Sequence, residues 1–116
     1  MNDESTKVEQ VLVIDDDLAY KKLLIRRLQA FMPSANIIDY DNLTDARADL
    51  TSQKDIYYDL VILDEHLPDG RGVELLEEGW FRELAVLTIS SDTEPETMGR
   101  VVGAGAQFFL NKVQIK

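Results

Sequence analysis

The sequence predicts a single α/β domain in which helices cover both faces of a parallel sheet. Short apolar runs, typical of strands buried on both sides, alternate with segments whose apolar residues recur at helical spacing. This alternation is typical of βαβ units, and hence of parallel strands. The 116 residues are also enough to bury a core without disulfide or metal staples.

The composition limits the classes of function. The net charge is -10, which argues against direct nucleic-acid contact by this domain, because phosphate recognition needs a concentrated basic surface. The acidity is compatible with a cation site, but on charge alone solubility explains it better. The chain has no cysteine, which excludes a thiolate zinc site and favours a cytoplasmic environment. No apolar run approaches the roughly 18 residues of a spanning helix, so we expect a soluble protein without a membrane segment.

The first strand is predicted at residues 11–14 and ends in the run Asp15, Asp16 and Asp17. One of these aspartates should cap the following helix, with the others near its positive end. The apolar positions of that helix are Tyr20, Leu24, Leu28 and Phe31. Pro33 ends it, and Asn36–Tyr40 is predicted as the second strand.

The middle of the chain contains two further helices around a central strand. The second helix is marked by Leu43, Ala46 and Leu50. Residues 60–63 form a continuous apolar run that stops at Asp64, which predicts a buried strand with a carboxylate at its end. Turn residues follow, and residues 73–84 are predicted as the third helix, although Gly79 should weaken or end it.

The last third of the chain adds two strands and one helix. Residues 85–89 are predicted as a fourth buried strand, followed by Ser90. The acidic turn at residues 94–96 contains a proline and should start a fourth helix. Small residues then end this helix before a last strand at residues 107–110.

Polar residues follow four of the predicted strands: Asp15 with Asp16, then Asp64, Ser90 and Lys112. Ligands of open α/β sheets bind beyond the carboxyl ends of the strands, so we expect these side chains to converge. Close carboxylates repel by about 1–4 kcal/mol per pair at a surface-like dielectric, so a cation should lie among them. Oxygen ligands without imidazole or thiolate suit Mg²⁺.

A carboxylate beside Mg²⁺ can act as a nucleophile towards phosphorus and form an aspartyl phosphate. Lys112 would then offer a positive charge, and Ser90 a hydroxyl donor, to the phosphoryl oxygens. Positioning and charge neutralisation dominate phosphoryl transfer, so no further acid or base is required. Taken singly, Asp15 is explained as a helix cap and Asp64 as a turn residue; their joint position with Lys112 favours the site.

Four motifs, VLVIDDD, VILDEHLPDGRG, VLTISS and GAGAQFFLNK, resemble in order and spacing the receiver domain of two-component response regulators. The resemblance implies a flavodoxin-like, doubly wound sheet of five parallel strands in the order 2-1-3-4-5. It implies one receiver domain over residues 1–116, with a core at 8–112 and a polar tail at 1–7. Asp64 would be the phosphoacceptor, served by a histidine kinase or a histidine phosphotransfer protein.

By the same resemblance, Asp15, Asp16, Asp64 and the backbone carbonyl of His66 hold Mg²⁺. The domain would promote only its own phosphorylation and dephosphorylation and would not otherwise be an enzyme.

The resemblance also implies a switch. Ser90 and Phe109 would change the surface formed by the fourth helix and the last strand, to which an output domain or an effector binds. His66 and Asp92 occupy positions that influence the lifetime of the phosphoryl group.

Two features depart from the family pattern. Val113 stands where a proline after a cis bond is common; because a cis bond before another residue costs about 2.5–4 kcal/mol, we expect a trans bond and a shifted loop that affects the reach of Lys112. The usual fifth helix is largely missing. Either the sequence is a piece of a longer regulator that has lost its output domain, which we favour, or a partner covers the open apolar sheet face. We expect the isolated chain to expose this apolar face or to associate through it, for example as a homodimer.

Two alternative functions stay open. A pseudo-receiver would bind its partner without phosphorylation, which Val113 and the missing helix allow. A haloacid-dehalogenase-like phosphatase would use Asp15 to Asp17 as its Asp-x-Asp motif. Against the phosphatase, Ala19 and Tyr20 replace its usual Ser or Thr, and the chain has no room for a second acidic motif and cap.

Overall fold

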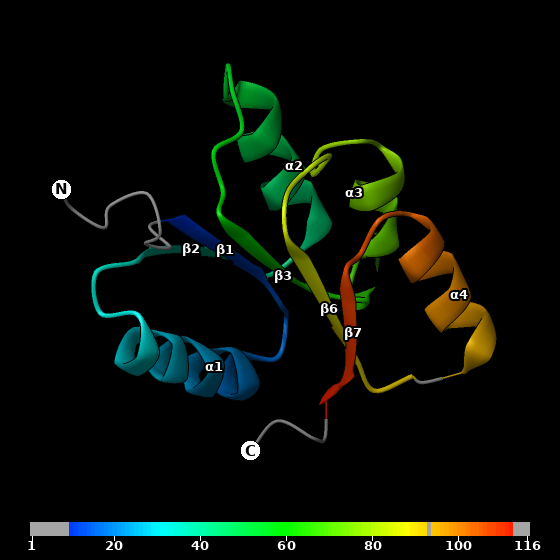
Figure 1. Ribbon diagram of the computed structural model, residues 1–116, viewed down its shortest axis with the longest axis horizontal. Coiled ribbons are helices and arrows are strands. Elements are labelled where there is room, and N and C mark those ends of the chain that lie inside the picture. Colours follow the sequence, from blue (N-terminus) through cyan, green and yellow to red (C-terminus); the bar gives the residue numbers. More distant parts are fainter. Residues whose placement is uncertain (1–9, 93, 113–116) are drawn as a thin grey trace, which may run out of the picture.

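A five-stranded parallel sheet forms the centre of the computed structural model, which describes residues 10–92 and 94–112 (Figure 1). Its strands are β1 (Gln10–Ile14), β2 (Asn36–Tyr40), β3 (Leu60–Asp64), β6 (Val86–Ser90) and β7 (Phe108–Asn111). They lie in the order β2-β1-β3-β6-β7, and all four neighbouring pairs are parallel. Since β6 and β7 are the fourth and fifth strands of this sheet, the predicted order 2-1-3-4-5 is confirmed.

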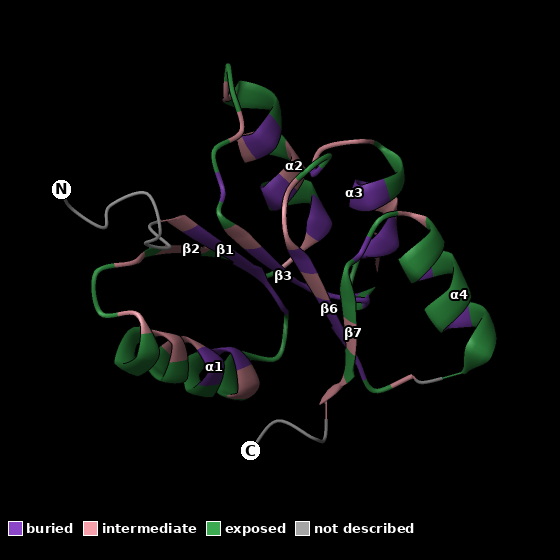
Figure 2. Ribbon diagram, in the orientation of Figure 1, coloured by how far each residue is buried: buried purple, intermediate pink, exposed green. Residues whose placement is uncertain are grey.

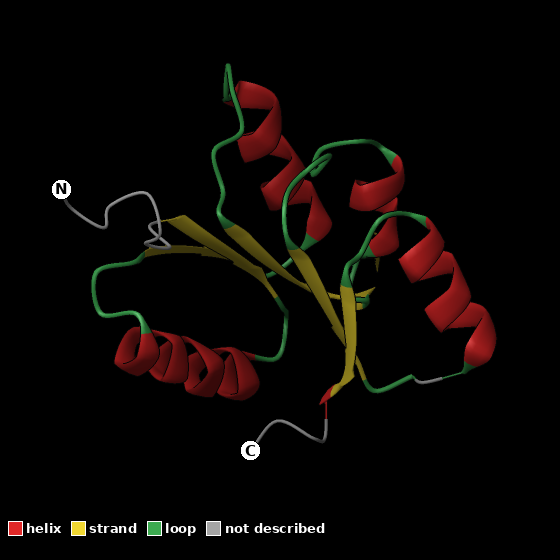
Figure 3. Cartoon of the chain, in the orientation of Figure 1, coloured by secondary structure: helices red, strands yellow, loops and turns green. Residues whose placement is uncertain are grey.

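Within the part of the chain that the structure describes, four helices cover the two faces of the sheet (Figure 3). They are α1 (Leu18–Phe31), α2 (Leu43–Ser52), α3 (Val73–Glu77) and α4 (Pro95–Gly103). Leu24 of α1 packs with Val11 and Val13 on one face. The other three helices enclose the larger core cluster, to which β1 contributes Leu12 and Ile14. Successive strand residues thus point to opposite faces, as a doubly wound sheet requires.

Burial is concentrated in the central strands (Figure 2). Four consecutive residues of β1 have no exposed surface, and β3 is buried from Val61 to Asp64. Strands covered on both faces need apolar side chains at every position, which explains the continuous apolar runs. The same burial places the final carboxylates of β1 and β3 at the edge of the core.

The helix starts follow local capping chemistry. The side chain of Asp17 accepts a hydrogen bond from the backbone N of Tyr20 (3.0 Å) and so caps α1. In the same way, the side-chain Oδ1 of Asn42 accepts a hydrogen bond from the backbone N of Asp45 (2.7 Å) and caps α2. Pro95 is the first residue of α4.

The third helix is shorter than the predicted residues 73–84, and the expectation that Gly79 weakens or ends it is confirmed. α3 ends at Glu77, and Gly79 follows with a φ of 88°, a left-handed conformation that breaks the helix and that glycine adopts readily. Trp80 still packs against the larger core cluster from the turn that follows.

A short antiparallel ribbon after Asp64 was not predicted. It consists of β4 (His66–Leu67) and β5 (Gly70–Arg71). Between them, the carboxylate of Asp69 accepts hydrogen bonds from the backbone N of Leu43 and of Thr44, both at 2.8 Å. The turn of the ribbon is therefore fixed to the first turn of α2.

The α1 face of the sheet is open beside β7. Phe109 packs against the larger core cluster, so its neighbours in β7 point to the α1 face. Phe108 is 64% exposed and Leu110 39% exposed, and within the described residues no helix covers them. None of the described helices is long and apolar enough to cross a membrane. The tail at 1–7 and the expected trans bond at Val113 lie outside the described residues.

Candidate functional site

Three carboxylates meet at the carboxyl ends of the central strands. Asp15 follows β1, and Asp64 ends the neighbouring strand β3. One carboxylate oxygen from each of Asp15, Asp16 and Asp64 lies within 4.8 Å of the other two. Asp15 and Asp64 are buried while Asp16 is exposed, so the cluster is reached from solvent beside Asp16.

Lys112 reaches this cluster from the end of β7. Its Nζ donates to Oδ1 of Asp15 (3.0 Å) and to Oδ2 of Asp64 (3.1 Å). Burial alone would lower the pKa of Lys112, but the hydrogen bond to Asp15 and the charge of Asp64 raise it. The lysine is therefore a cation at neutral pH, placed between two carboxylates.

The electrostatic balance still disfavours an ionised Asp64. Burial, helped by the neighbouring Asp15, raises the pKa of Asp64 to about 7, and the ammonium of Lys112 only partly opposes this. An added cation would favour the ionised carboxylate, which is the nucleophilic form.

Tyr20 is a site neighbour that sequence reasoning missed. Nζ of Lys112 lies 4.6 Å from the centre of the Tyr20 ring, close enough for a cation–π interaction. The Tyr20 hydroxyl is buried and has no hydrogen-bond partner among the described residues. We assigned Tyr20 to the apolar stripe of the first helix; its position three residues after the capping Asp17 was the available signal.

Ser90 ends β6 and is fully buried. The strand register sets Asp64 opposite Ile89, so Ser90 extends one residue further along the neighbouring strand. Its Oγ accepts a hydrogen bond from the backbone N of Asp92 (2.9 Å), and its own O–H is a donor. Phe109 is half-buried against the larger core cluster, on the α4 face.

His66 and Asp92 lie beside this site and contact each other. The backbone N of His66 donates to Oδ1 of Asp64 (3.2 Å), and its Nε2 is 3.7 Å from Oδ2 of Asp92. Hydrogen bonds from the backbone N of Glu94 and from Thr97 lower the pKa of Asp92, so this carboxylate is ionised near neutrality.

The donor set fits a magnesium ion. Oδ1 of Asp15 accepts from the backbone N of Asp17 and from Lys112, while Oδ2 is buried without a hydrogen-bond partner in the described residues. An orphaned carboxylate oxygen beside two further carboxylates is a site of hard oxygen ligands, with no imidazole or thiolate in the cluster.

Comparison with known proteins agrees with this geometry. Residues 11–115 match the family model described as the response regulator receiver domain. The chain belongs to this family. As a receiver domain, it is the part of a two-component response regulator that the four sequence motifs indicated.

Curated relatives of this receiver domain are longer proteins. Protein-glutamate methylesterase/protein-glutamine glutaminase 3 of Geobacter sulfurreducens is 33% identical over 87% of the chain, which covers 27% of that protein. The transcriptional regulatory protein CitT of Halalkalibacterium halodurans is 27% identical over 92% of the chain and 47% of the relative. The two-component response regulator ARR5 of Arabidopsis thaliana is 28% identical over 93% of the chain and 65% of the relative. The chain thus spans less than two thirds of each.

Solved structures agree in fold. The phosphorylated cyanobacterial phytochrome response regulator RcpA superposes with a TM-score of 0.81 at 17% identity, over 93% of the chain and 86% of the other. A response regulator from Burkholderia pseudomallei, solved with a phosphorylated aspartic acid, a calcium ion and citrate, has a TM-score of 0.76 at 22% identity, over 90% of this chain and 59% of that one.

This receiver domain also contains an ion pair to a buried carboxylate that sequence reasoning missed. The carboxylate of Glu65, the residue after Asp64, has no exposed surface and pairs with Nε of Arg71 at 2.7 Å. The available signal was an acidic residue directly after a buried strand, with an arginine six positions later in the turn.

Proposed function

We propose that this receiver domain accepts a phosphoryl group on Asp64 from a histidine kinase or a histidine phosphotransfer protein. The observation that carries the proposal is the double contact of Lys112 with Asp15 and Asp64, at 3.0 and 3.1 Å. It joins a nucleophilic carboxylate, a cation ligand and a phosphate-binding charge at one point. The phosphorylated aspartic acid and calcium ion in the similar Burkholderia protein support the same chemistry here.

In this proposal Asp15, Asp16, Asp64 and the backbone carbonyl of His66 hold Mg²⁺. When bound, the metal neutralises charge on the transferring phosphoryl group. A carboxylate oxygen of Asp64 forms the new bond to phosphorus while the bond from phosphorus to the donor's imidazole nitrogen breaks, and the released imidazole takes a proton from water. Hydrolysis later returns the carboxylate and inorganic phosphate.

Two side chains then bind the phosphoryl oxygens. Lys112 turns its ammonium from Oδ2 of Asp64 to a phosphoryl oxygen, as a point charge. Ser90 donates its hydroxyl hydrogen to another phosphoryl oxygen. In the present arrangement its Oγ accepts a hydrogen bond from the backbone N of Asp92. His66 and Asp92 flank the site and set how fast water reaches the phosphorus.

The output surface in this proposal is formed by α4 and β7. Movement of Ser90 towards the phosphoryl group lets Phe109 turn inward, which changes the surface offered to an output domain or an effector. Phosphorylation biases this equilibrium only through its different contacts in the two states. We further propose that residues 1–116 act as one receiver domain with a core at 8–112, working in the cytoplasm within a longer protein.

The test is incubation with a small phosphodonor and Mg²⁺, followed by intact mass spectrometry. Wild type should gain one phosphoryl group, and Asp64→Asn should gain none. Asp55→Asn, which changes an exposed carboxylate outside the cluster, is the matched control and should behave as wild type. A wild type that takes no phosphoryl group from any donor overturns the proposal in favour of a phosphorylation-independent binding module. Hydrolysis of a phosphomonoester that Asp15→Asn abolishes and Asp64→Asn preserves would favour a phosphatase.

A further inference from the structure

The buried Glu65 anchors a polar chain that leads away from the phosphoacceptor. Its Oε1 accepts from the backbone N of Val73 (2.9 Å), and its Oε2 accepts from Nε of Arg71 (2.7 Å). A fully buried carboxylate persists only when it is paired in this way. Arg71 is therefore held firmly at its Nε end.

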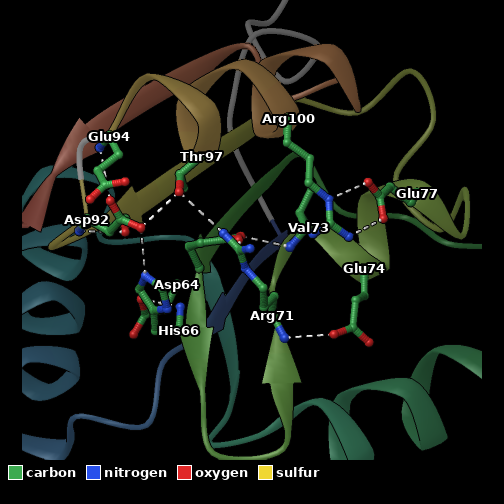
Figure 4. A network of polar contacts seen from close by, with 12 residues as sticks. Asp64, His66, Arg71, Val73, Glu74, Glu77, Asp92, Glu94, Thr97 and Arg100 are labelled. Carbon is green, nitrogen blue, oxygen red and sulfur yellow. Dashed lines mark hydrogen bonds and ion pairs between the residues drawn. The ribbon is translucent and has the colours of Figure 1, made fainter.

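The other end of the Arg71 guanidinium reaches α4. Its Nη2 donates to Oγ1 of Thr97 at 3.4 Å, a long hydrogen bond (Figure 4). Thr97 is nearly buried in the first turn of α4, and its hydroxyl donates to Oδ2 of Asp92 at 2.8 Å. One planar group thus joins the segment after the phosphoacceptor to the start of a helix 26 residues away.

The polar chain then returns to the site. Oδ1 of Asp92 accepts from the backbone N of Glu94, which fixes the loop before α4, and the backbone N of Asp92 donates to Oγ of Ser90. Figure 4 shows His66 approaching the same Asp92 carboxylate from the β4–β5 ribbon. Glu65, next to Asp64, and Ser90 are therefore the two ends of one series of contacts that passes through α4.

We propose that Arg71 is a positioning residue that couples the segment after Asp64 to the first turn of α4. This inference rests on the proposed phosphorylation of Asp64. When Ser90 turns towards a phosphoryl group, its contact with Asp92 changes, and Asp92 and Thr97 adjust with it. Arg71 cannot move together with them, because breaking its ion pair would leave the buried Glu65 carboxylate without a counter-charge. The long bond between Arg71 and Thr97 is the contact that breaks or shortens, and it sets the position of α4.

Two conservative variants interrupt the polar chain between Glu65 and Ser90 while keeping a positive charge or the arginine itself beside Glu65. Arg71→Lys retains a charge for Glu65 but lacks the planar fork that reaches Glu65 and Thr97 together. Thr97→Val keeps the side-chain shape and removes the hydroxyl. The matched control is Arg100→Lys, because Arg100 also belongs to α4 and also forms an ion pair, with Glu77 of α3, at 2.8 and 2.9 Å. That exposed pair does not contact Glu65.

The experiment is hydrogen exchange of the α4 segment with and without a small phosphodonor and Mg²⁺, with phosphoryl occupancy measured by intact mass in the same samples. In wild type and Arg100→Lys, phosphorylation should change α4 exchange. Arg71→Lys and Thr97→Val should take up the phosphoryl group yet lose roughly half or more of that change. An unchanged α4 response in both variants, or an equal loss in Arg100→Lys, overturns the inference. A merely structural role would lower the melting temperature and leave the phosphorylation-dependent difference intact.

Failure of the proposed function has a different signature. If wild type takes no phosphoryl group, the proposed function fails. The coupling between Arg71 and α4 is then tested by comparing hydrogen exchange of the unphosphorylated wild type and variants. Arg71→Lys and Thr97→Val should then exchange faster than wild type at the start of α4, whereas Arg100→Lys should not. Equal exchange in all four proteins overturns the coupling.

Discussion

The ring of Tyr20 supports the ammonium of Lys112, whose Nζ lies 4.6 Å from the ring centre. Tyr20 belongs to the first turn of α1 and Lys112 follows β7, so the contact spans the edge of the sheet where the three carboxylates meet. The ring restricts a long, flexible side chain to the direction of Asp15 and Asp64.

Removing this ring should slow phosphorylation of Asp64. A cation–π contact at a partly buried site contributes about 0.5–1.4 kcal/mol, so Tyr20→Leu should lower the initial rate by about 2- to 10-fold. Intact mass against time with a small phosphodonor measures that rate. Tyr20→Phe keeps the ring and should stay near wild type; an equal loss in Tyr20→Phe would assign the effect to the buried hydroxyl instead.

Asp64→Asn should stabilise the fold at alkaline pH in the absence of divalent cations. The folded-state pKa of Asp64, about 7, lies above the ordinary value of 3.8 for an aspartate, so the stability from its protonated form is present below pH 3.8 and is lost as pH rises through 7. Asparagine avoids that loss. We expect a gain on the order of 1–3 kcal/mol at pH 8, after allowing for solvent screening at the rim, and little gain near pH 4. Urea unfolding at both pH values measures it.

Added Mg²⁺ provides the control for that comparison. It should raise the stability of wild type at pH 8 more than that of Asp64→Asn, since the variant lacks one carboxylate ligand. A variant less stable than wild type at pH 8 without metal would contradict the electrostatic account.

Asp69→Ala should weaken the attachment of the β4–β5 turn to α2. Although desolvation opposes it, hydrogen bonds from the Thr44 hydroxyl and from the backbone N of Leu43 lower the pKa of Asp69 to about 2. The contribution to stability is therefore present above pH 3.8 and is lost as pH falls through 2. A lost cap of this kind costs about 1–2 kcal/mol at pH 7, measured by urea unfolding. Asp55→Ala is the exposed control, and equal losses in both variants would refute the capping role.

Gly72→Ala should disturb the phosphoacceptor directly. A Cβ at Gly72 would lie 2.3 Å from the carbonyl oxygen of Asp64 and 2.9 Å from Cγ of Leu63, so the backbone must shift. We expect a loss of about 2–3 kcal/mol in unfolding free energy, together with weaker Mg²⁺ binding. Gly99→Ala in α4 meets nothing within 4 Å and should stabilise by up to about 1 kcal/mol. Wild-type stability and Mg²⁺ affinity in Gly72→Ala would contradict the packing argument.

The open face beside β7 should make the chain associate. Phe108 and Leu110 expose apolar surface there, so sedimentation should show a mass that rises with concentration. Phe108→Lys should reduce the association, whereas Phe31→Lys, at the far end of α1, should not. A stable monomer at all concentrations would count against this prediction.

The sequence was informative wherever a residue's position follows from the backbone pattern. Asp15 and Asp64 end runs that must be buried strands, and parallel pairing then sets them side by side. Lys112 follows the last strand of the same sheet. These placements depend on periodicity and topology, which a single sequence carries.

Contacts between side chains were not predictable in the same way. Glu65 and Arg71 are only six positions apart, but the packed fold is needed to show that the Glu65 carboxylate is fully buried and that Arg71 pairs with it. Asp69 caps a helix 25 residues earlier, which no local rule signals. The exact end of α3 could not be predicted either, because Gly79 weakens a helix while tertiary packing decides whether the helix continues past it.

The contact between Lys112 and Asp15 joins positions 97 residues apart, near the two ends of the described chain. Because Lys112 follows the other site residues in the sequence, it is synthesised after all of them. A nascent chain lacking β7 would carry the carboxylates without their counter-charge, so competence to accept a phosphoryl group would report that synthesis and docking of the final strand are complete.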